Sequence, residues 1–134
     1  MDDDLPARFQ ATDYRVRLPR GGWATIRIGE PLPPALRALA GPQPWGFVTA
    51  WNPRSQACSR PRNRDAQRRL LAALQASPST VAIRPALGVG KDWREPSLFV
   101  TGLDTAALDA LALRHGQLAY LHGESGDPAR LRWL

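Results

Sequence analysis

Five arginines lie within ten residues of this sequence, between Arg60 and Arg69. Ser59 is a typical N-cap residue and Pro61 suits a first helical turn, so the arginines begin a helix. A helix N-terminus carries partial positive charge and favours acidic residues, so arginine there opposes the helix dipole. A phosphate or carboxylate would relieve this opposition, because free backbone N–H groups and guanidinium groups both bind anions. The pattern suits an anionic small ligand near the helix start.

The side chains around this helix start have two interpretations. Asparagine and serine could donate hydrogen bonds to a ligand, or they could satisfy the local backbone, which is their usual role at turns and caps. The arginines could hold an anion or extend into water, where salt screens them. Our first hypothesis is a small protein that binds a phosphate-bearing ligand. Its candidate ligand-binding residues here are Asn52, Arg54, Ser59, Arg60, Asn63 and Arg64.

A second group of chemically useful side chains lies in the segment GVGKDWREPS, residues 88–97. The segment lacks the spacing of a phosphate-binding glycine loop. Glu95 could be a general base or could pair with an arginine, and Trp93 could stack on a ligand or shield the edge of the core. Ser97 and, further along the chain, Gln117 complete the candidate ligand-binding set.

The second hypothesis is therefore an enzyme in which Glu95 is the general base. Asn52, Asn63 and Gln117 would orient its substrate. This hypothesis predicts that these side chains share a pocket and that burial raises the pKa of Glu95. A solvent-exposed Glu95 paired with an arginine would argue against it.

Nucleophilic and metal chemistry have less support. Arginines around Cys58 would lower the pKa of its thiol, but a catalytic cysteine needs a base nearby, and only His115 and His122 are available. One cysteine excludes an intramolecular disulfide and a cysteine-based zinc site. Because the acidic residues and histidines show no ligand spacing, we predict no metal and no cofactor.

The composition allows a third hypothesis, a nucleic-acid or protein adaptor that uses a basic face. The formal net charge is +6, and the isoelectric point of the sequence is about 10.9. All 18 basic residues except Lys91 are arginine, and alanine and proline are abundant. A GC-rich genome produces this bias without selection for a partner, so nucleic acid is the less favoured partner.

The sequence also indicates a compartment. No apolar run approaches the roughly 18 residues that span a bilayer. The beginning of the chain, MDDDLPARFQ, is acidic and lacks the apolar segment of a secretory signal. With a single cysteine, these features predict a cytoplasmic protein without a membrane segment. Nothing in the sequence indicates an oligomeric state.

The hydrophobic pattern and the turn residues predict an α+β fold. A hairpin of two strands should turn at residues 20–22, and the helix that begins at Ser59 should end near Ser77 with Asp104 capping the next one. The predicted strands cover residues 12–18, 23–29, 44–52, 79–88, 96–102, 117–123 and 129–134. The predicted helices cover residues 34–41, 59–77 and 105–115.

We expect a mainly antiparallel sheet with helices on one face. From Phe47 onward the order of the first six elements matches a split βαβ, the ferredoxin-like arrangement, preceded by the N-terminal hairpin. A chain of 134 residues should form a single domain over residues 1–134, with residues 1–10 loose and residues 44–134 as its core.

Three short motifs resemble those of a small bacterial family of unknown function: T-A-x-N-P, W-x-E-x-S and G-Q-x-A. An asparagine in the helix after the first motif belongs to the same pattern. The matching positions are Thr49, Ala50, Asn52, Pro53, Asn63, Trp93, Glu95, Ser97, Gly116, Gln117 and Ala119. The resemblance covers roughly residues 44 to 122 and implies no activity. Cys58 lies outside the pattern.

A ferredoxin-like sheet would separate two of these motifs. We expect Asn52 and Gln117 at one end of such a sheet and the loop over residues 89–95 at the opposite end. Glu95 would then not reach Asn52. The motifs should form two separate corners, or else the topology is not ferredoxin-like.

Overall fold

The computed structural model describes residues 5–124 and 126–134, which fold into α+β architecture with an all-antiparallel sheet. Its seven strands follow the order β2-β1-β4-β5-β3-β6-β7. The described elements are α1 (Leu5–Ala11), β1 (Asp13–Arg17), β2 (Trp23–Ile26), α2 (Pro34–Ala40), β3 (Trp45–Val48), η1 (Pro53–Ser55), α3 (Arg60–Ala76), β4 (Ala82–Val89), β5 (Arg94–Thr101), α4 (Thr105–Arg114), β6 (Ala119–Gly123) and β7 (Arg130–Trp133).

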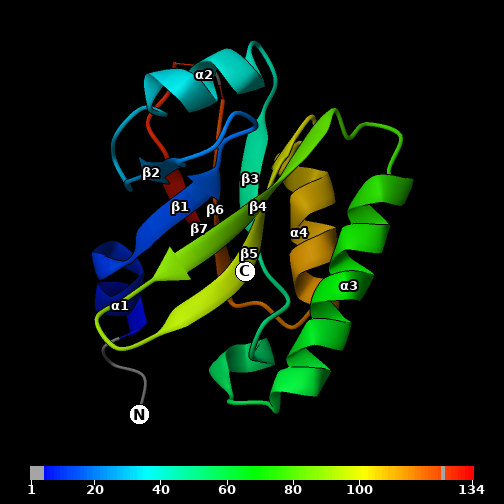
Figure 1. Ribbon diagram of the computed structural model, residues 1–134. Helices are drawn as coiled ribbons and strands as arrows, with labels where there is room; N and C mark the ends of the chain where they lie inside the picture. The colour runs from blue at the N-terminus through cyan, green and yellow to red at the C-terminus, as the bar shows by residue number, and fades with distance from the viewer. Residues whose placement is uncertain (1–4, 125) are drawn as a thin grey trace.

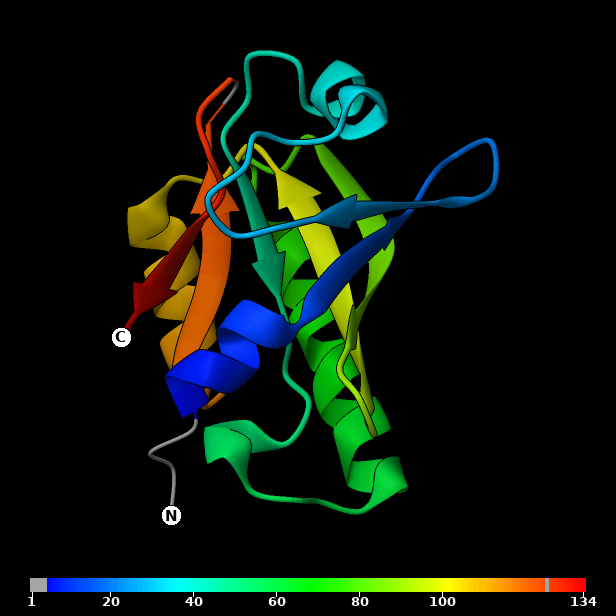
Figure 2. The ribbon, with the colours of Figure 1, turned by 90° about the vertical axis from the view of Figure 1, so that its left-hand side faces the viewer.

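The sheet curls into a half-barrel because its two edges come together (Figure 2). The chain beyond β2 forms a parallel bridge to the residue before β7, between Ile28 and Ala129. Gly29 N donates to Ala129 O at 2.8 Å, and Ala129 N donates to Glu30 O at 2.8 Å. These bonds give the sheet a concave and a convex face.

Helices α3 and α4 cover the convex face, as Figure 1 shows. Leu70 and Leu74 of α3 and Leu108 of α4 pack there against Val48 and Val100 of the sheet. Side chains alternate along a strand, so the neighbouring residues face the other way. The capping predictions are confirmed, because Ser59 Oγ accepts from Arg62 N and Asp104 accepts from Ala107 N.

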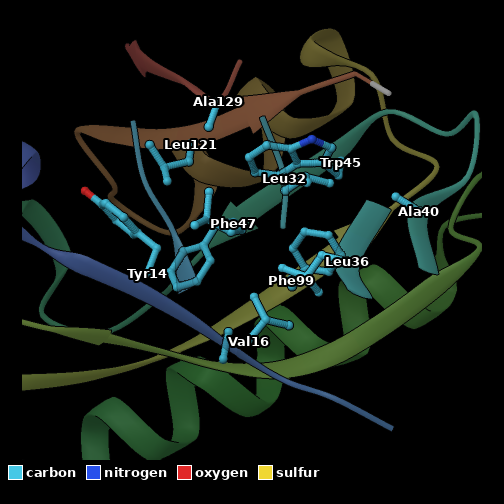
Figure 3. Close-up of a cluster of buried hydrophobic side chains, with 12 residues drawn as sticks. Tyr14, Val16, Leu32, Leu36, Ala40, Trp45, Phe47, Phe99, Leu121 and Ala129 are labelled. Atoms are coloured by element: carbon cyan, nitrogen blue, oxygen red, sulfur yellow. The ribbon is translucent and has the colours of Figure 1, made fainter. Parts of the chain in front are cut away.

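The concave face holds a second apolar cluster, drawn in Figure 3. Phe47 and Phe99 of the central strands meet Val16 and Leu36 there. Helix α2 lies at one end of this face and α1 at the other (Figures 1 and 2). The expectation that all helices cover one face therefore holds only for α3 and α4.

The N-terminal segment also differs from the prediction. Residues 5–10 were expected to be loose, yet they belong to α1, and Leu5 is buried. The polar composition concealed a helix in which Leu5 is buried and Phe9 is half-buried, while Ala7 and Ala11 are exposed. Residues 1–4 lie outside the described residues. No helix of the described segments is both long and apolar enough to cross a membrane.

One end of the sheet gathers the three motifs. Strand β3 pairs antiparallel with both β5 and β6, with Phe47 opposite Phe99 and Leu121. Strands β5 and β6 therefore start at the end of the sheet where β3 finishes. The expectation that Glu95 and Asn52 lie at opposite ends of the sheet is wrong, because antiparallel pairing places the β4–β5 hairpin beside the end of β3.

Close packing at the sheet end opposite this hairpin gives a first prediction. Gly102 has φ of 105°, and a methyl group there would overlap the backbone oxygen of Ser79. We expect Gly102→Ala to lower the free energy of unfolding by about 2 to 4 kcal/mol, because strain and overlap act together. Urea denaturation measures the loss.

Gly22→Ala is the matched control for this substitution. Gly22 has φ of 80°, and no atom lies within 4 Å of an added methyl group. Gly22→Ala should lower the free energy of unfolding by only about 1 kcal/mol, the cost of a side chain in the left-handed backbone conformation. Equal losses in the two variants would contradict the packing argument.

Candidate functional site

A cavity of about 80 Å³ lies at the gathered end of the sheet, on its concave side. We call it the Glu95 cavity. Its walls come from α1, the start of β1, the β4–β5 hairpin, the end of β3 and the segment that leads into β6. Of the predicted site residues, it brings together Trp93, Glu95, Ser97 and Gln117. Four separate stretches of the sequence, within residues 5–14, 47–55, 88–97 and 117–121, thus line one space.

Glu95 contributes an ionisable carboxyl group to this cavity. Its side chain is half-buried, and no hydrogen bond or ion pair joins its carboxylate to the described residues. Burial raises the pKa of Glu95 from 4.5 to about 7, although the positive charge of Arg8 acts in the opposite direction. The carboxyl group therefore exchanges protons near neutral pH.

Asp109 and Asp13 are carboxylates that do form ion pairs. Asp109 Oδ1 accepts from Tyr120 Oη at 2.6 Å and from Arg132 Nε at 2.7 Å. The Arg132 hydrogen bond is the main cause that lowers the pKa of Asp109 to about 2. Asp13 pairs with Arg27 at 3.0 Å. Glu95 differs from these two groups because it forms no ion pair among the described residues, although Arg8 lies close enough for its charge to act on the carboxyl group.

Helix α1 is fastened over the cavity by two hydroxyl groups. Tyr14 Oη donates to Phe9 O at 2.7 Å, and Thr12 Oγ1 donates to Arg8 O at 2.6 Å. The Tyr14 hydroxyl points away from the apolar cluster that holds its ring (Figure 3). Burial raises the pKa of Tyr14, so its hydroxyl stays protonated at neutral pH.

The W-x-E-x-S motif shapes the hairpin that carries Glu95. The indole of Trp93 lies against Gly90, where any side chain would overlap it. Gly90 N also donates to Trp93 O at 3.0 Å. Ser97 Oγ donates to Glu95 O at 3.0 Å, which fixes the backbone of the glutamate. Trp93 and Ser97 thus hold the hairpin in shape beside the carboxyl group.

The T-A-x-N-P and G-Q-x-A motifs contact each other beside the cavity. Arg54 N donates to Gly116 O at 2.6 Å, and a methyl group on Gly116 would lie 2.9 Å from Pro53 Cβ. Gln117 Nε2 donates to His115 O at 3.2 Å and to Trp51 O at 3.5 Å. Hydrogen bonds therefore tie the end of β3 to the start of β6.

Asn52 and Asn63 form a clasp that closes the loop before α3. Asn52 N donates to Asn63 Oδ1 at 2.9 Å, and Asn63 Nδ2 donates to Asn52 Oδ1 at 2.8 Å. Cys58 N donates to the same Asn52 oxygen at 3.0 Å. Asn63 is buried. These contacts serve the local backbone, and neither asparagine lines the Glu95 cavity.

The predicted basic residues lie on several surfaces. Arg60 and Arg64 line a groove between α3 and the β4–β5 hairpin, whereas Arg54 lines a hollow beside the end of α4. Ser59 caps α3. Binding of an anion by these residues stays a prediction, since Arg60 and Arg64 share one groove but Arg54 lines another hollow.

Several cavity residues were missed by sequence reasoning. Arg8, Thr12 and Tyr14 come from the N-terminal segment, and Thr49 comes from the end of β3. The alternation of the first predicted strand signals that Tyr14 is buried, but no local pattern signals that α1 folds back over the β4–β5 hairpin. The described residues contain no group of three or more histidine, cysteine, aspartate or glutamate side chains that could hold a metal ion.

The raised pKa of Glu95 predicts a pH dependence of stability. The carboxyl group of Glu95 binds a proton more readily in the folded state than in the unfolded state. Its contribution to the free energy of unfolding is therefore complete below pH 4.5 and is lost as the pH rises through about 7. Glu95→Gln cannot ionise, so it should exceed the wild type in unfolding free energy at pH 8 by about 1 to 3 kcal/mol. The two should converge below pH 4.5. Urea denaturation across this pH range measures the difference.

Glu30→Gln is the control for this measurement, because Glu30 is exposed. Its pH profile should follow that of the wild type. A Glu95→Gln profile that runs parallel to the wild type from pH 4 to pH 8 would contradict the burial of the carboxyl group.

The asparagine clasp gives another prediction. Asn63→Ala removes the acceptor of Asn52 N and two donated bonds, so we expect a loss of about 2 to 3 kcal/mol in unfolding free energy and faster proteolysis within residues 52–59. Gln75→Ala, an exposed position of the same helix, should change the unfolding free energy by less than about 0.5 kcal/mol. Unchanged proteolysis in Asn63→Ala would show that the clasp does not hold the loop.

Comparisons with known proteins agree with the motif pattern. No curated protein and no solved structure matched the chain. One family model matches residues 48–120, more than half of the 134 residues, and the matched stretch contains all three motifs. The chain belongs to that family, which is described as "Protein of unknown function (DUF3293)".

Proposed function

We propose that the protein binds a small molecule in the Glu95 cavity and that the Glu95 carboxyl exchanges a proton with it, as a general base or acid. One observation carries the proposal: a carboxyl group without a partner among the described residues faces a cavity, and burial raises its pKa to about 7. Such a group populates both protonation states at neutral pH, which suits proton transfer.

The volume and the lining of the cavity restrict the size and the chemistry of the ligand group that fits inside it. A volume of about 80 Å³ holds roughly six water-sized groups. Phe9 and Phe47 supply apolar wall, while Thr12 and Ser97 lie among the polar lining residues. The enclosed part should therefore be short, with an apolar portion against the aromatic rings. It should also carry an amine, amide or hydroxyl group that meets Glu95.

Of the three side chains predicted to orient a substrate, Gln117 is the one that fits this proposal. It lines the cavity with Glu95, whereas Asn52 and Asn63 bond to each other. Their role is to hold the loop beside the cavity. A binding protein without catalysis is the alternative, in which protonated Glu95 donates a hydrogen bond to its ligand.

The anion hypothesis is less well supported. The amides of Asn52 and Asn63 are engaged with the local backbone and with each other, and the Ser59 hydroxyl caps α3. Of the predicted arginines, Arg60 and Arg64 line one groove and Arg54 lines a separate hollow. An anionic ligand at the start of α3 would have to use arginines alone.

We also propose that the core of the fold is ferredoxin-like. The strand order β4-β5-β3-β6 supports this, because α3 connects β3 to β4 and α4 connects β5 to β6. A split βαβ unit has this order of strands and connections. Strands β1, β2 and β7 and helices α1 and α2 would then be additions that convert an open sheet into a half-barrel.

Small polar molecules test the proposed function. We expect ligand-observed NMR at pH 7 to find, among amides, amines and alcohols of up to about eight non-hydrogen atoms, a compound that binds the wild type and not Glu95→Gln. At about 100 times its dissociation constant such a compound should add about 2.7 kcal/mol to wild-type stability.

Glu30→Gln should retain the binding, because its carboxylate lies outside the cavity. Proton exchange also predicts that affinity changes with pH around 7 in the wild type and not in Glu95→Gln. If every compound that binds at millimolar concentration binds Glu95→Gln equally well, the proposal is wrong.

A further inference from the structure

The convex face carries a second hollow, independent of the Glu95 cavity. It is a groove of about 610 Å³ between α3 and the strands β4 and β5. Alternation along β5 places Glu95 and Ser97 on the concave side and Arg94, Pro96 and Leu98 on the other. The two hollows therefore lie on opposite faces of the same hairpin.

Four arginines line this groove, which we call the arginine groove. Arg60, Arg64 and Arg68 form one row along α3, and Arg94 comes from β5. All four are exposed. Among the described residues none of the four forms an ion pair, and no aspartate or glutamate lines the groove. The nearby Asp65 pairs with Arg69 instead.

The floor of the groove is apolar. Leu71 of α3, Leu87 of β4 and Pro96 and Leu98 of β5 form it, and Trp51 lines it as well. Several of these side chains are only partly buried, since α3 does not reach across the hairpin. An apolar floor flanked by uncompensated positive charge is a surface that a complementary partner could cover.

Gln67 belongs to the wall of the groove. Its Oε1 accepts from Ala50 N at 2.9 Å, which fixes the amide against the end of β3.

We propose that the arginine groove binds an acidic peptide segment that carries apolar side chains. Carboxylates would pair with the guanidinium groups, which suit two-pronged binding of carboxylates. Leucine-like side chains would cover the floor. A volume of about 610 Å³ is large enough for a few side chains.

The groove fits a peptide better than a nucleic acid strand. Proteins that bind single-stranded nucleic acids have a positively charged groove with several aromatic side chains on which the bases stack. Here Trp51 is the one aromatic residue among the groove residues, and the rest of the floor is aliphatic. An aliphatic floor matches leucine side chains more closely than it matches bases or phosphates.

A direct binding measurement tests the proposal. The probe is a fluorescein-labelled ten-residue peptide of glutamate and aspartate with three leucines, titrated with the full-length protein and followed by anisotropy. We expect saturable binding that weakens at least about tenfold between 50 and 300 mM salt. Replacing the leucines by serine should weaken it by a similar factor, because the floor then stays uncovered.

Paired charge reversals localise the binding. Arg64→Glu combined with Arg68→Glu should reduce affinity at least about tenfold, since like charges would then face the peptide. Arg20→Glu combined with Arg62→Glu changes the net charge equally outside the groove and should retain binding within about twofold. Circular dichroism checks that both variants are folded.

Three results would overturn the proposal. The first is no binding at 1 mM protein. The second is an equal loss in the two double variants, which would mean that bulk charge alone attracts the peptide. The third is a ten-nucleotide single-stranded DNA or RNA that binds more tightly than the peptide and loses affinity in Arg64→Glu/Arg68→Glu, which would assign the groove to nucleic acid.

Discussion

The fold depends on β3, a strand buried on both faces and paired on both edges. Trp45, Gly46, Phe47 and Val48 are all buried, and β3 joins β5 on one side to β6 on the other. Gly46 has no side chain, so Leu108 of α4 comes close enough that a methyl group would lie 2.8 Å from it. Both apolar clusters and the end of the sheet where the motifs meet are organised around these four residues.

Because the side chains of a strand alternate, one short hairpin serves two surfaces. Glu95 and Ser97 belong to the concave face and Arg94 and Pro96 to the convex face. The carboxyl group faces an enclosed space, where burial controls its protonation. The guanidinium group faces an open groove, where water and salt screen it. Neighbouring residues thus experience different electrostatic environments through backbone geometry alone.

Much of the fold could be predicted from local patterns. Local sequence alone determines the helix caps at Ser59 and Asp104. It also determines the strands in which apolar and polar residues alternate. The curl of the sheet could not be predicted, because it depends on the meeting of Ile28 and Ala129, about a hundred residues apart. Helix α1 was missed for the same reason, since its polar composition hides contacts that only the folded sheet supplies.

The candidate site, like the fold, could be predicted from the sequence only in part. Motif resemblance singled out Glu95, Ser97 and Gln117, which the cavity brings together. It also singled out Asn52 and Asn63, whose hydrogen bonds are structural. A sequence motif does not separate residues that shape a loop from residues that could contact a ligand. The separation needs hydrogen-bond partners, and Glu95 is distinguished by having none for its carboxylate among the described residues.

The position of α1 has a practical consequence for handling the protein. Phe9 lines the cavity and packs edge-on against Trp133, with ring centres 5.2 Å apart, while Leu134 N donates to Leu118 O at 3.0 Å. The α1 segment therefore lines the cavity, and the end of the chain packs against residues that line it. An affinity tag or fluorescent fusion joined to either would lie close to the cavity wall. A label on the turn at Gly21 and Gly22, between β1 and β2, would avoid this wall, because neither glycine contributes to it.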